Sequence, residues 1–348
     1  MTAIDGTDDR SPARPVTLAD LAKAAGTSPS TASRAMSGRG YVSAAVRRRL
    51  MEAAEQLGYV PDASAQTLKQ RTSRVIGVAV SDLRDPFYAQ VAAGAEQTLR
   101  DVGYQVVLVT DNSETGEEVA AARTFLALRA PGVIITPVGR EATTLLRLQG
   151  VAVVEADRHL APGECDAVVL DNEQAAIDAM THLIAFGHER IGLLTVDTDW
   201  TSDAGRLQGY RTALRQAGLR FDPALLVKVA PHDSEDRIDR RIRDLLGRGG
   251  LTAMFAANNG LTVRAWQVLR RAGLRLPDDI SLVGFDDVAW MDMVTPGITA
   301  VAQPTVDLGW RAAQLLLRRM RDRTLPPTVE QLDGRLVVRG STGPPRRA

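Results

Sequence analysis

The sequence predicts an α/β protein in which a small all-α N-terminal headpiece precedes two doubly wound lobes, each built on a parallel sheet. Three observations lead to this fold class. Helix signals follow one another closely between Thr17 and Gly58. From Val75 onward, short apolar runs alternate with longer amphipathic segments at intervals of roughly thirty residues, as in βα units. The alternation begins again after Asp171 and Asn172, which indicates a second lobe of the same kind.

The headpiece is predicted to contain three short helices. The first begins at Thr17, because Thr17 and Asp20 have the spacing of a capping box and apolar residues follow at helical intervals. Ser28 is a good N-cap and Pro29 a good first helical residue, so a second helix starts almost at once. Ser43 caps a third helix. The result is a helix, a short turn and a helix, with a third helix completing one small core.

Charge is distributed unevenly along the chain. The 348 residues include 42 Lys+Arg and 42 Asp+Glu, so the formal net charge is zero. Residues 14–74 nevertheless hold ten basic and four acidic side chains, whereas residues 75–348 hold 31 basic and 35 acidic ones. A compact basic segment favours attraction to a polyanion such as nucleic acid, although a solvated basic face has the same composition.

The second predicted helix carries side chains suited to DNA. Two helices joined by a short turn can place the second one in the major groove, with its N-terminal residues at the base edges. Arg34 can donate two parallel bonds to guanine, a contact worth roughly 1 to 3 kcal/mol of base discrimination. Two alternatives stay open from the residues alone: Arg34 could pair with a carboxylate, and the helix pair could serve packing only.

Residues 16–68 resemble the DNA-binding headpiece of the lactose-repressor (LacI) family of transcription regulators. The family pattern is roughly T-hydrophobic-x-D-hydrophobic-A-x-x-A-G-V-S-x-x-T-V-S-R. It is matched by TLADLAKAAGTSPSTASR, with Thr27 and Ala32 where the family usually has Val. The resemblance implies that the contacts to double-stranded DNA are made by Thr17, Ser28, Pro29, Ser30, Thr31, Arg34, Tyr41, Ser43 and Leu68.

Residues 59–69 are predicted to be a hinge that becomes helical only when something holds it, because a helix this short is unstable alone in water. In the family, a hinge helix at this place folds on the operator and wedges a Leu between base steps of the minor groove. Leu68 stands at that position. Asp62 replaces the common Asn and Gln66 a common Arg, which weakens the match. A plain linker with one exposed Leu is the alternative.

The resemblance extends over the rest of the chain. Segments such as IGVAVSDLRDPFYAQVAAGAE and GFDDVAWMDMVTPGITAVAQP look like the family's effector domain, which is related to periplasmic sugar-binding proteins. The resemblance implies three crossings between the lobes, near residues 170–172, 301–303 and 332–335. The predicted organisation is therefore a disordered tail at 1–14, a helix-turn-helix headpiece at 15–60, a hinge at 61–73, an effector-binding and dimerisation domain at 74–340 (lobe 1: 74–170 and 303–332; lobe 2: 172–301 and 335–340) and a C-terminal tail at 341–348.

The effector site is expected in the cleft between the two lobes, because the loops at the carboxyl ends of parallel strands face it. Asp286 in GFDD and Arg206 in RLQGY match the carboxylate and the guanidinium with which the family binds sugar hydroxyls. As a stacking aromatic, Phe87 ranks before Trp200 and Trp290. The full predicted effector site consists of Ser81, Asp85, Phe87, Asp157, Arg206, Asn258, Asp286 and Gln303.

No catalytic residue, metal site or cofactor is predicted. The four histidines are scattered, and the sequence lacks H-E-x-x-H, P-loop, G-x-S-x-G and G-x-G-x-x-G motifs. Cys165 is the single cysteine, so it cannot form an internal disulfide, and it is expected to be an incidental surface thiol. Without a signal peptide or a long apolar run, the protein is expected in the cytoplasm, associated with the nucleoid when it binds DNA.

Together these features predict a DNA-binding transcriptional regulator, and the resemblance implies a repressor that is released by a small carbohydrate. It would bind a pseudo-palindromic operator as a homodimer. In the implied mechanism, effector changes the angle between the lobes and separates the two hinge segments, so that Leu68 is withdrawn. Two alternatives remain: the same class of regulator sensing a purine or another metabolite, and a sugar-binding transport protein, which the basic headpiece opposes.

Overall fold

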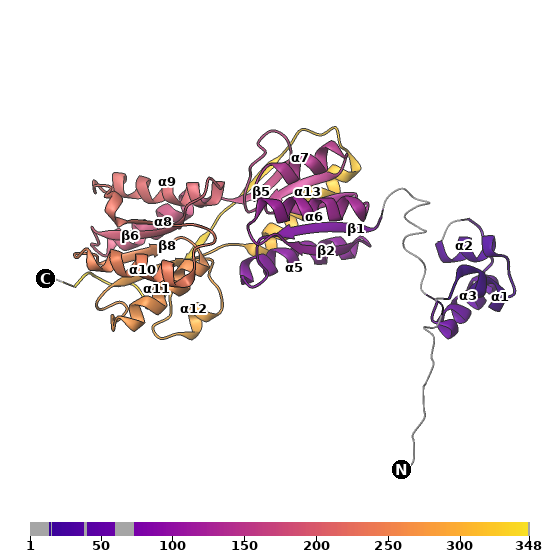
Figure 1. The fold of residues 1–348 in the computed structure, drawn as a ribbon, viewed down its shortest axis with the longest axis horizontal. Coiled ribbons are helices and arrows are strands. Elements are labelled where there is room, and N and C mark those ends of the chain that lie inside the picture. Colours follow the sequence, from indigo (N-terminus) through magenta and orange to yellow (C-terminus); the bar gives the residue numbers. More distant parts are fainter. Residues whose placement is uncertain (1–13, 15, 38–39, 60–72, 347–348) are drawn as a thin grey trace, which may run out of the picture. The chain divides into compact units, whose positions relative to one another are not determined.

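The computed structural model describes residues 14, 16–37, 40–59 and 73–346 and forms two compact units, Met1–Ser73 and Arg74–Ala348 (Figure 1). Of the predicted tail at 1–14, only Arg14 is described. Of the predicted hinge at 61–73, only Ser73 is described, and Leu68 therefore lies outside the described residues. Each unit has its own hydrophobic core.

The N-terminal unit contains three described helices, α1 (Leu18–Ala24), α2 (Pro29–Ser37) and α3 (Ala44–Leu57). Both bonds of the predicted capping box are present: Asp20 N donates to Thr17 Oγ1, and Thr17 N donates to Asp20 Oδ2 at 2.9 Å. Gly58 ends α3 with φ 61°, a left-handed conformation that favours glycine. The helices bury a core of small residues around two leucines: Leu21, Ala22, Ala25, Ala32, Ala35, Leu50, Ala53 and Ala54.

The first lobe of the second unit is a six-stranded, fully parallel sheet in the order β11-β5-β4-β3-β1-β2. Along β1, Ile76, Val78 and Val80 face a different core from Ala79, as the period of two in a strand requires. One face is covered by α5 (Pro86–Asp101) and α13 (Thr305–Arg321), the other by α6 (Thr115–Ala127) and α7 (Glu141–Leu148). The strands are β1 (Val75–Val80), β2 (Gln105–Thr110), β3 (Gly132–Ile135), β4 (Ala152–Ala156), β5 (Asp166–Leu170) and β11 (Val329–Leu332).

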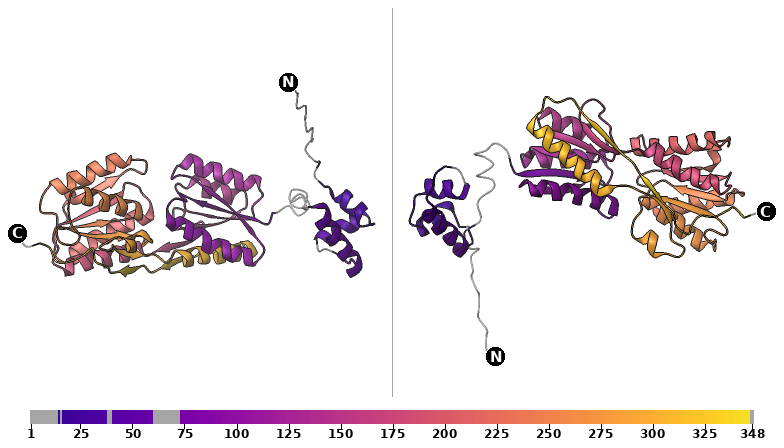
Figure 2. Two further views of the ribbon diagram at one scale, coloured as in Figure 1. Left: turned by 90° about the horizontal axis from the view of Figure 1, so that it is seen from below. Right: turned by 180° about the vertical axis from the view of Figure 1, so that it is seen from behind.

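The second lobe repeats this plan, with six strands in the order β12-β10-β9-β8-β6-β7 and an antiparallel strand, β12, at one edge. Helices α8 (Asn172–Ala185) and α9 (Thr201–Gln216) cover one face, and α10 (Glu235–Gly247) and α11 (Asn259–Arg271) cover the other (Figure 2). The strands are β6 (Ile191–Val196), β7 (Leu226–Val229), β8 (Ala253–Ala256), β9 (Ser281–Phe285), β10 (Thr299–Ala302) and β12 (Arg335–Val337), with a short helix α12 (Trp290–Met293) after β9.

The chain passes between the lobes three times, after β5, after β10 and after β11. The first lobe therefore receives α13 and β11 from the C-terminal part of the chain. Two glycines permit the close contact of α13 with α5: a Cβ on Gly94 would collide with Val306 O, and one on Gly309 would collide with Val91 O. None of the described helices is long and apolar enough to cross a lipid bilayer.

Candidate functional site

The first candidate surface is the N-terminal end of α2. Ser28 caps this end, because Thr31 N donates to Ser28 Oγ at 3.2 Å. The Ser28 hydroxyl also pairs with the hydroxyls of Ser30 and Thr31, each at 2.9 Å. Pro29 and Ser30 are exposed, and Thr31 is half-buried. These side chains leave a polar, solvent-facing helix end of the kind that meets base edges in the major groove.

Arg34 lies one turn further along α2 and is exposed. Its Nε donates to Ser30 O at 3.3 Å, and its Nη2 donates to Thr31 Oγ1 at 3.4 Å. No carboxylate of the described residues forms an ion pair with it, so the alternative of an acidic partner finds no support there. Both contacts are long, and the guanidinium therefore stays available to a ligand in solvent.

The remaining predicted DNA contacts are placed around this helix. The hydroxyls of Thr17 and Ser43 cap α1 and α3, which puts them at helix ends where backbone N–H groups point outward. Tyr41 is 91% exposed and precedes α3. Leu68 lies outside the described residues.

The second candidate site is a cavity of about 230 Å³ between the two lobes of the second unit. Ser81, Asp157 and Asp286 directly follow β1, β4 and β9, so each stands at the carboxyl end of a parallel strand. The cavity wall includes all of the residues that the sequence predicts for an effector site: Ser81, Asp85, Phe87, Asp157, Arg206, Asn258, Asp286 and Gln303.

Asp286 and Asp157 are held in an unusual backbone conformation, with φ of 63° and 69°. Left-handed backbone is costly for residues other than glycine, and it occurs at binding sites where the surroundings enforce it. Asp286 Oδ1 accepts a bond from Gln303 Nε2 at 2.5 Å, and Oδ2 accepts one from Asn259 N at 3.1 Å. The Asp286 carboxylate is thus fixed from two directions.

Arg206 is buried, with 5% of the residue exposed, and three contacts orient its side chain. Its Nε donates to Asn172 Oδ1 at 2.8 Å, and its Nη1 donates to Ala257 O at 2.6 Å. The guanidinium also lies 3.8 Å from the centre of the Phe285 ring. A planar cation held this rigidly loses little conformational entropy when a ligand oxygen binds to it.

Sequence reasoning missed Arg158, which contributes to the cavity wall beside Asp157. Its Nη2 donates to Tyr88 Oη at 2.9 Å, and its guanidinium covers the Trp200 ring at 3.5 Å. Only its position next to a predicted site residue could have suggested it. Trp200, considered from the sequence only as a stacking aromatic, also lines the wall. The other residues of the wall that were not predicted are Asp82, Tyr88, Ser113, Val196, Ser202, Asp203, Pro231 and Gly260.

The two tryptophans considered for ligand stacking are placed differently. Trp200 lines the cavity, and its Nε1 donates across the lobes to Val138 O at 3.1 Å. Trp290 is not part of the cavity wall. It packs against Trp266 at 5.7 Å, and its Nε1 donates to Asn259 Oδ1 at 3.0 Å. The expectation that Trp290 could stack on a ligand is therefore wrong for this cavity, because its ring is used in the core of lobe 2.

The cavity is acidic. Its wall has five carboxylates against the two guanidiniums of Arg158 and Arg206. Burial raises the pKa of Asp85 to about 6, and the nearby Asp286 carboxylate adds to this rise. Burial also raises the pKa of Asp157 to about 6, although Arg158 opposes the shift. Near neutral pH most of these carboxyl groups are ionised. The cavity therefore repels anionic ligands, and its carboxylates accept hydrogen bonds from ligand hydroxyl groups.

Cys165 corrects a prediction made from the sequence. It was expected at the surface because its neighbours are polar, but it is only 5% exposed. Burial raises the pKa of its thiol, which disfavours the thiolate form that a nucleophile needs. The polar neighbours Glu164 and Asp166 are occupied by Arg147 and Arg319, so the cysteine itself can turn inward.

Comparisons with known proteins identify the family of the chain and the type of each unit. Residues 17–62 match the family described as bacterial regulatory proteins, lacI family, and residues 180–342 match the periplasmic binding protein-like domain. The transcriptional repressor CytR of Escherichia coli K12 is 31% identical over 337 residues, which cover 94% of this chain and 96% of CytR. The chain belongs to the lacI family. The family expected from the headpiece motif is thus confirmed, and the protein is a helix-turn-helix transcriptional regulator.

Other relatives in the lacI family match over similar lengths. The transcriptional regulator CelR of Thermobifida fusca is 34% identical over 336 residues, covering 93% of this chain and 98% of CelR. A solved CelR–cellobiose complex has a TM-score of 0.71 at 31% identity and covers 94% of this chain and 100% of that one. A lac repressor dimer bound to operator and the anti-inducer ONPF has a TM-score of 0.81 at 27% identity, covering 95% and 100%. The predicted fold class is confirmed.

Proposed function

We propose that this lacI-family regulator represses transcription as a homodimer on a pseudo-palindromic operator, and that an uncharged small carbohydrate in the cavity between its lobes controls operator affinity. The observation that carries the proposal is the fixed group of Asp286, Gln303 and Arg206 on one wall of an acidic cavity. The regulator acts by binding both ligands, without a chemical step.

The chemistry of the cavity suits a polyol. Each sugar hydroxyl donates one hydrogen bond and accepts others, so a sugar site needs acceptors and donors side by side. Asp286 and Asp157 supply acceptors, and Arg206 supplies donors. Gln303 Oε1 is buried and has no hydrogen-bond partner among the described residues, so it can accept a hydrogen bond from a ligand hydroxyl group. Phe87 offers an apolar ring at the same wall.

The excess of carboxylates in the cavity wall favours uncharged ligands over anionic ones. A sugar phosphate or a sugar acid would bring a negative charge among five aspartates and two arginines, at a cost that the buried setting increases. A neutral mono- or disaccharide avoids this repulsion. The solved CelR–cellobiose complex, which is 31% identical to this chain, supports a carbohydrate here as well.

On the DNA side, α2 would enter the major groove with Pro29, Ser30 and Arg34 at the base edges, and Thr17, Ser28, Thr31, Tyr41 and Ser43 at phosphates or adjacent bases. Leu68 would be the minor-groove wedge. The lac repressor, whose structure with operator resembles this chain at a TM-score of 0.81, supports this assignment. Symmetric half-sites would require the homodimer.

Coupling between the two sites would run through contacts that cross the lobes. His159 N donates to Thr201 Oγ1 at 3.1 Å, and Trp200 Nε1 donates to Val138 O at 3.1 Å. A sugar bound beside these contacts would favour one angle between the lobes. A coupling free energy of roughly 1 to 3 kcal/mol would change operator affinity by about 5- to 150-fold.

Thermal unfolding with a panel of ligands tests the effector half of the proposal. We expect a neutral mono- or disaccharide to raise the melting temperature, since a ligand at one hundred times its Kd stabilises by about 2.7 kcal/mol. Sugar phosphates should have no effect. Asp286→Asn should abolish the shift, whereas Asp287→Asn should retain it, because Asp287 lies outside the cavity wall and pairs with Arg339. A shift by nucleobases alone would favour the purine alternative instead.

Selection of binding sites from a random DNA library tests the other half. We expect the selected sequences to contain two half-sites in inverted repeat, bound less tightly when the sugar found above is added. Binding to single half-sites, with a complex of one chain, would contradict the homodimer.

A further inference from the structure

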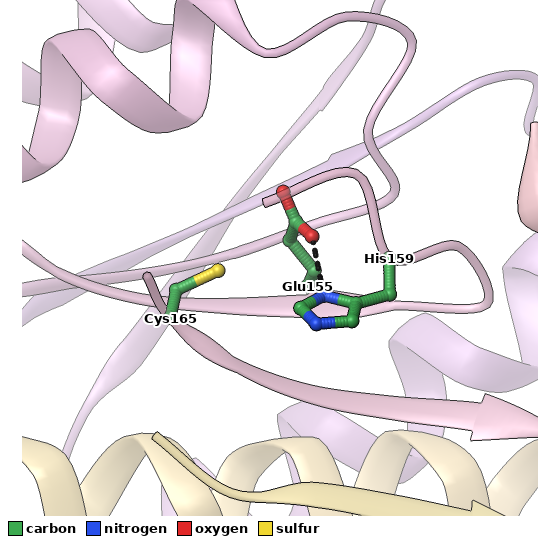
Figure 3. Close-up of side chains that lie close together, drawn as sticks. All are labelled: Glu155, His159 and Cys165. Carbon is green, nitrogen blue, oxygen red and sulfur yellow. Dashed lines mark hydrogen bonds and ion pairs between the residues drawn. The ribbon is translucent and has the colours of Figure 1, made fainter. Parts of the chain in front are cut away.

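Three side chains of the first lobe lie close together outside the wall of the effector cavity. Glu155 lies in β4, His159 in the loop that follows, and Cys165 directly before β5. One potential ligand atom from each lies within 4.8 Å of the other two. Figure 3 shows the Cys165 sulfur and the His159 ring turned toward the Glu155 carboxylate. The spacing in the sequence, over eleven residues from 155 to 165, resembles no common metal motif, which is why the sequence offered no signal.

This cluster is buried, yet its own hydrogen bonding is incomplete. The Glu155 side chain is 0% exposed and that of His159 is 13% exposed. His159 Nε2 is buried and has no hydrogen-bond partner among the described residues. Among the described residues, the single hydrogen-bond contact of the Cys165 sulfur is a long one of 4.0 Å to Ala161 O. Buried polar atoms normally have partners, so these two atoms need an explanation.

The Glu155 carboxylate is already held in one orientation. Its Oε1 accepts a bond from Thr143 Oγ1 at 3.0 Å. Its Oε2 accepts bonds from Leu160 N at 2.8 Å, from Ala161 N at 3.1 Å and from His159 Nδ1 at 2.9 Å. The bonds from Thr143, Leu160 and Ala161 come from outside the proposed ligand set and would fix the orientation of the carboxylate before a metal arrives.

We propose that Glu155, His159 and Cys165 bind a transition-metal dication of the zinc class. Sulfur, nitrogen and oxygen together form the ligand set of Zn²⁺, whereas Mg²⁺ and Ca²⁺ take oxygen ligands. On binding, the Cys165 thiol releases its proton to solvent, and the thiolate and the carboxylate then balance the two positive charges of the ion. Three protein ligands leave the fourth tetrahedral position to a water molecule.

The distances allow this with small side-chain movements. Bonds of about 2.0 to 2.3 Å in tetrahedral geometry place ligand atoms roughly 3.3 to 3.8 Å apart. The atoms now lie within 4.8 Å of one another, so the sulfur would move inward. The His159 ring would turn so that Nε2 becomes the ligand atom, which breaks the bond from Nδ1 to Glu155.

The metal site would also act on the effector cavity, an extension that rests on the proposed function. The loop between Glu155 and His159 carries Asp157 and Arg158, which line the cavity. His159 N bonds to Thr201 Oγ1 in the second lobe. A bound metal would hold this loop in one position. Metal and effector would therefore alter each other's affinity by the same factor, as linkage demands.

Cobalt and zinc titrations of the full chain, without effector or DNA, test the site itself. We expect Co²⁺ to produce the charge-transfer absorption of a cobalt–thiolate bond, which Zn²⁺ then removes by displacement. Cys165→Ser should abolish this absorption. His159→Gln should weaken Zn²⁺ binding by about tenfold or more. Even the loss of a residue that only supports a metal ligand typically lowers metal affinity by about that factor. Absence of the absorption in the unaltered chain would overturn the proposal.

A matched histidine provides the control. His232 is half-exposed and lies 3.2 Å from Glu114, so it is another His–Glu pair but has no cysteine beside it. His232→Gln should leave zinc affinity unchanged. Equal affinity in the unaltered chain and in His159→Gln, or a loss only in His232→Gln, would show that the site is not the one proposed. If Cys165→Ser fails to fold by circular dichroism, His159→Gln decides, because the His159 side chain is more exposed (13%) than Cys165 (5%) and its replacement should disturb the fold less. Since no sugar is present, failure of the effector proposal would not affect these results.

Discussion

The headpiece and the effector cavity use polar side chains in opposite ways. On α2, Arg34 and Ser30 are exposed, and the described core beneath them is apolar. In the cavity, Arg206 and Asp286 are buried and hydrogen-bonded to the backbone that surrounds them. In the headpiece, the side chains expected to contact DNA therefore contribute little to the stability of the fold. In the cavity, the side chains expected to contact the effector also stabilise the fold. Mutations should reveal this difference as effects on binding alone or on binding and stability together.

The largest effect is expected from Arg206→Ala. The substitution removes the hydrogen bonds to Asn172 Oδ1 and Ala257 O and leaves both acceptors buried. We expect the free energy of unfolding to fall by about 3 kcal/mol or more, because each hydrogen bond to a charged group contributes roughly 1.5 to 3 kcal/mol. Urea unfolding followed by circular dichroism measures the change. An unaltered midpoint would show that the cavity, like α2, separates recognition from stability.

Part of the pH dependence of stability should come from the carboxylates of the cavity. The pKa of Asp157 is about 6 in the folded chain, above the value of 3.8 for an unperturbed carboxyl. The folded state therefore binds the proton more tightly, so this group stabilises the protein fully below about pH 4, and that stabilisation is lost as pH rises through about 6. The loss is up to about 3 kcal/mol.

Asp85 and Glu118 also have raised pKa values and contribute to the same pH dependence. The variant Asp157→Asn removes the contribution of Asp157 alone. We expect unfolding free energies measured between pH 4 and pH 7 to decline less steeply in the variant than in the unaltered chain. Parallel curves for the two proteins would mean that Asp157 ionises as easily in the folded chain as in the unfolded one.

Arg34→Ala should affect DNA binding and leave the stability of the headpiece unchanged. We expect a loss of roughly 1 to 3 kcal/mol in affinity for the selected operator, with relaxed preference at one base pair of each half-site. The melting temperature should not change, because the Arg34 contacts to Ser30 and Thr31 are long and exposed. Arg48→Ala on α3 is the control and should affect all DNA sequences equally or none. Fluorescence anisotropy with operator and unrelated DNA separates these outcomes.

The smallest effect is expected from Thr17→Ala. This change removes the capping box of α1, in which Asp20 N bonds to Thr17 Oγ1, and should destabilise the headpiece by about 1 kcal/mol. Hydrogen exchange of α1 amides measures this locally. The second unit, with its own cores, should exchange at unaltered rates, and a change there would argue against the division into two units.

Much of the fold could be predicted because the signals are local. Caps such as Thr17 and Ser43 satisfy amides within the next turn, and alternating apolar runs mark the strands of both lobes. The cavity wall was also predicted in part. Asp157 and Asp286 directly follow strands, and the carboxyl ends of parallel strands meet at one edge whatever the rest of the chain does.

The helix starts, the two βα repeats and the family motif of the headpiece could be predicted from the sequence alone. Each of them depends on residues that are only a few positions apart. Tertiary structure alone decided that Trp200 faces the cavity and Trp290 does not, that Arg158 covers Trp200, and that Cys165 is buried beside Glu155. The physical reason is that the direction of a loop side chain depends on its backbone angles and on neighbours distant in sequence. For Trp200, that neighbour is Val138 O, in the other lobe.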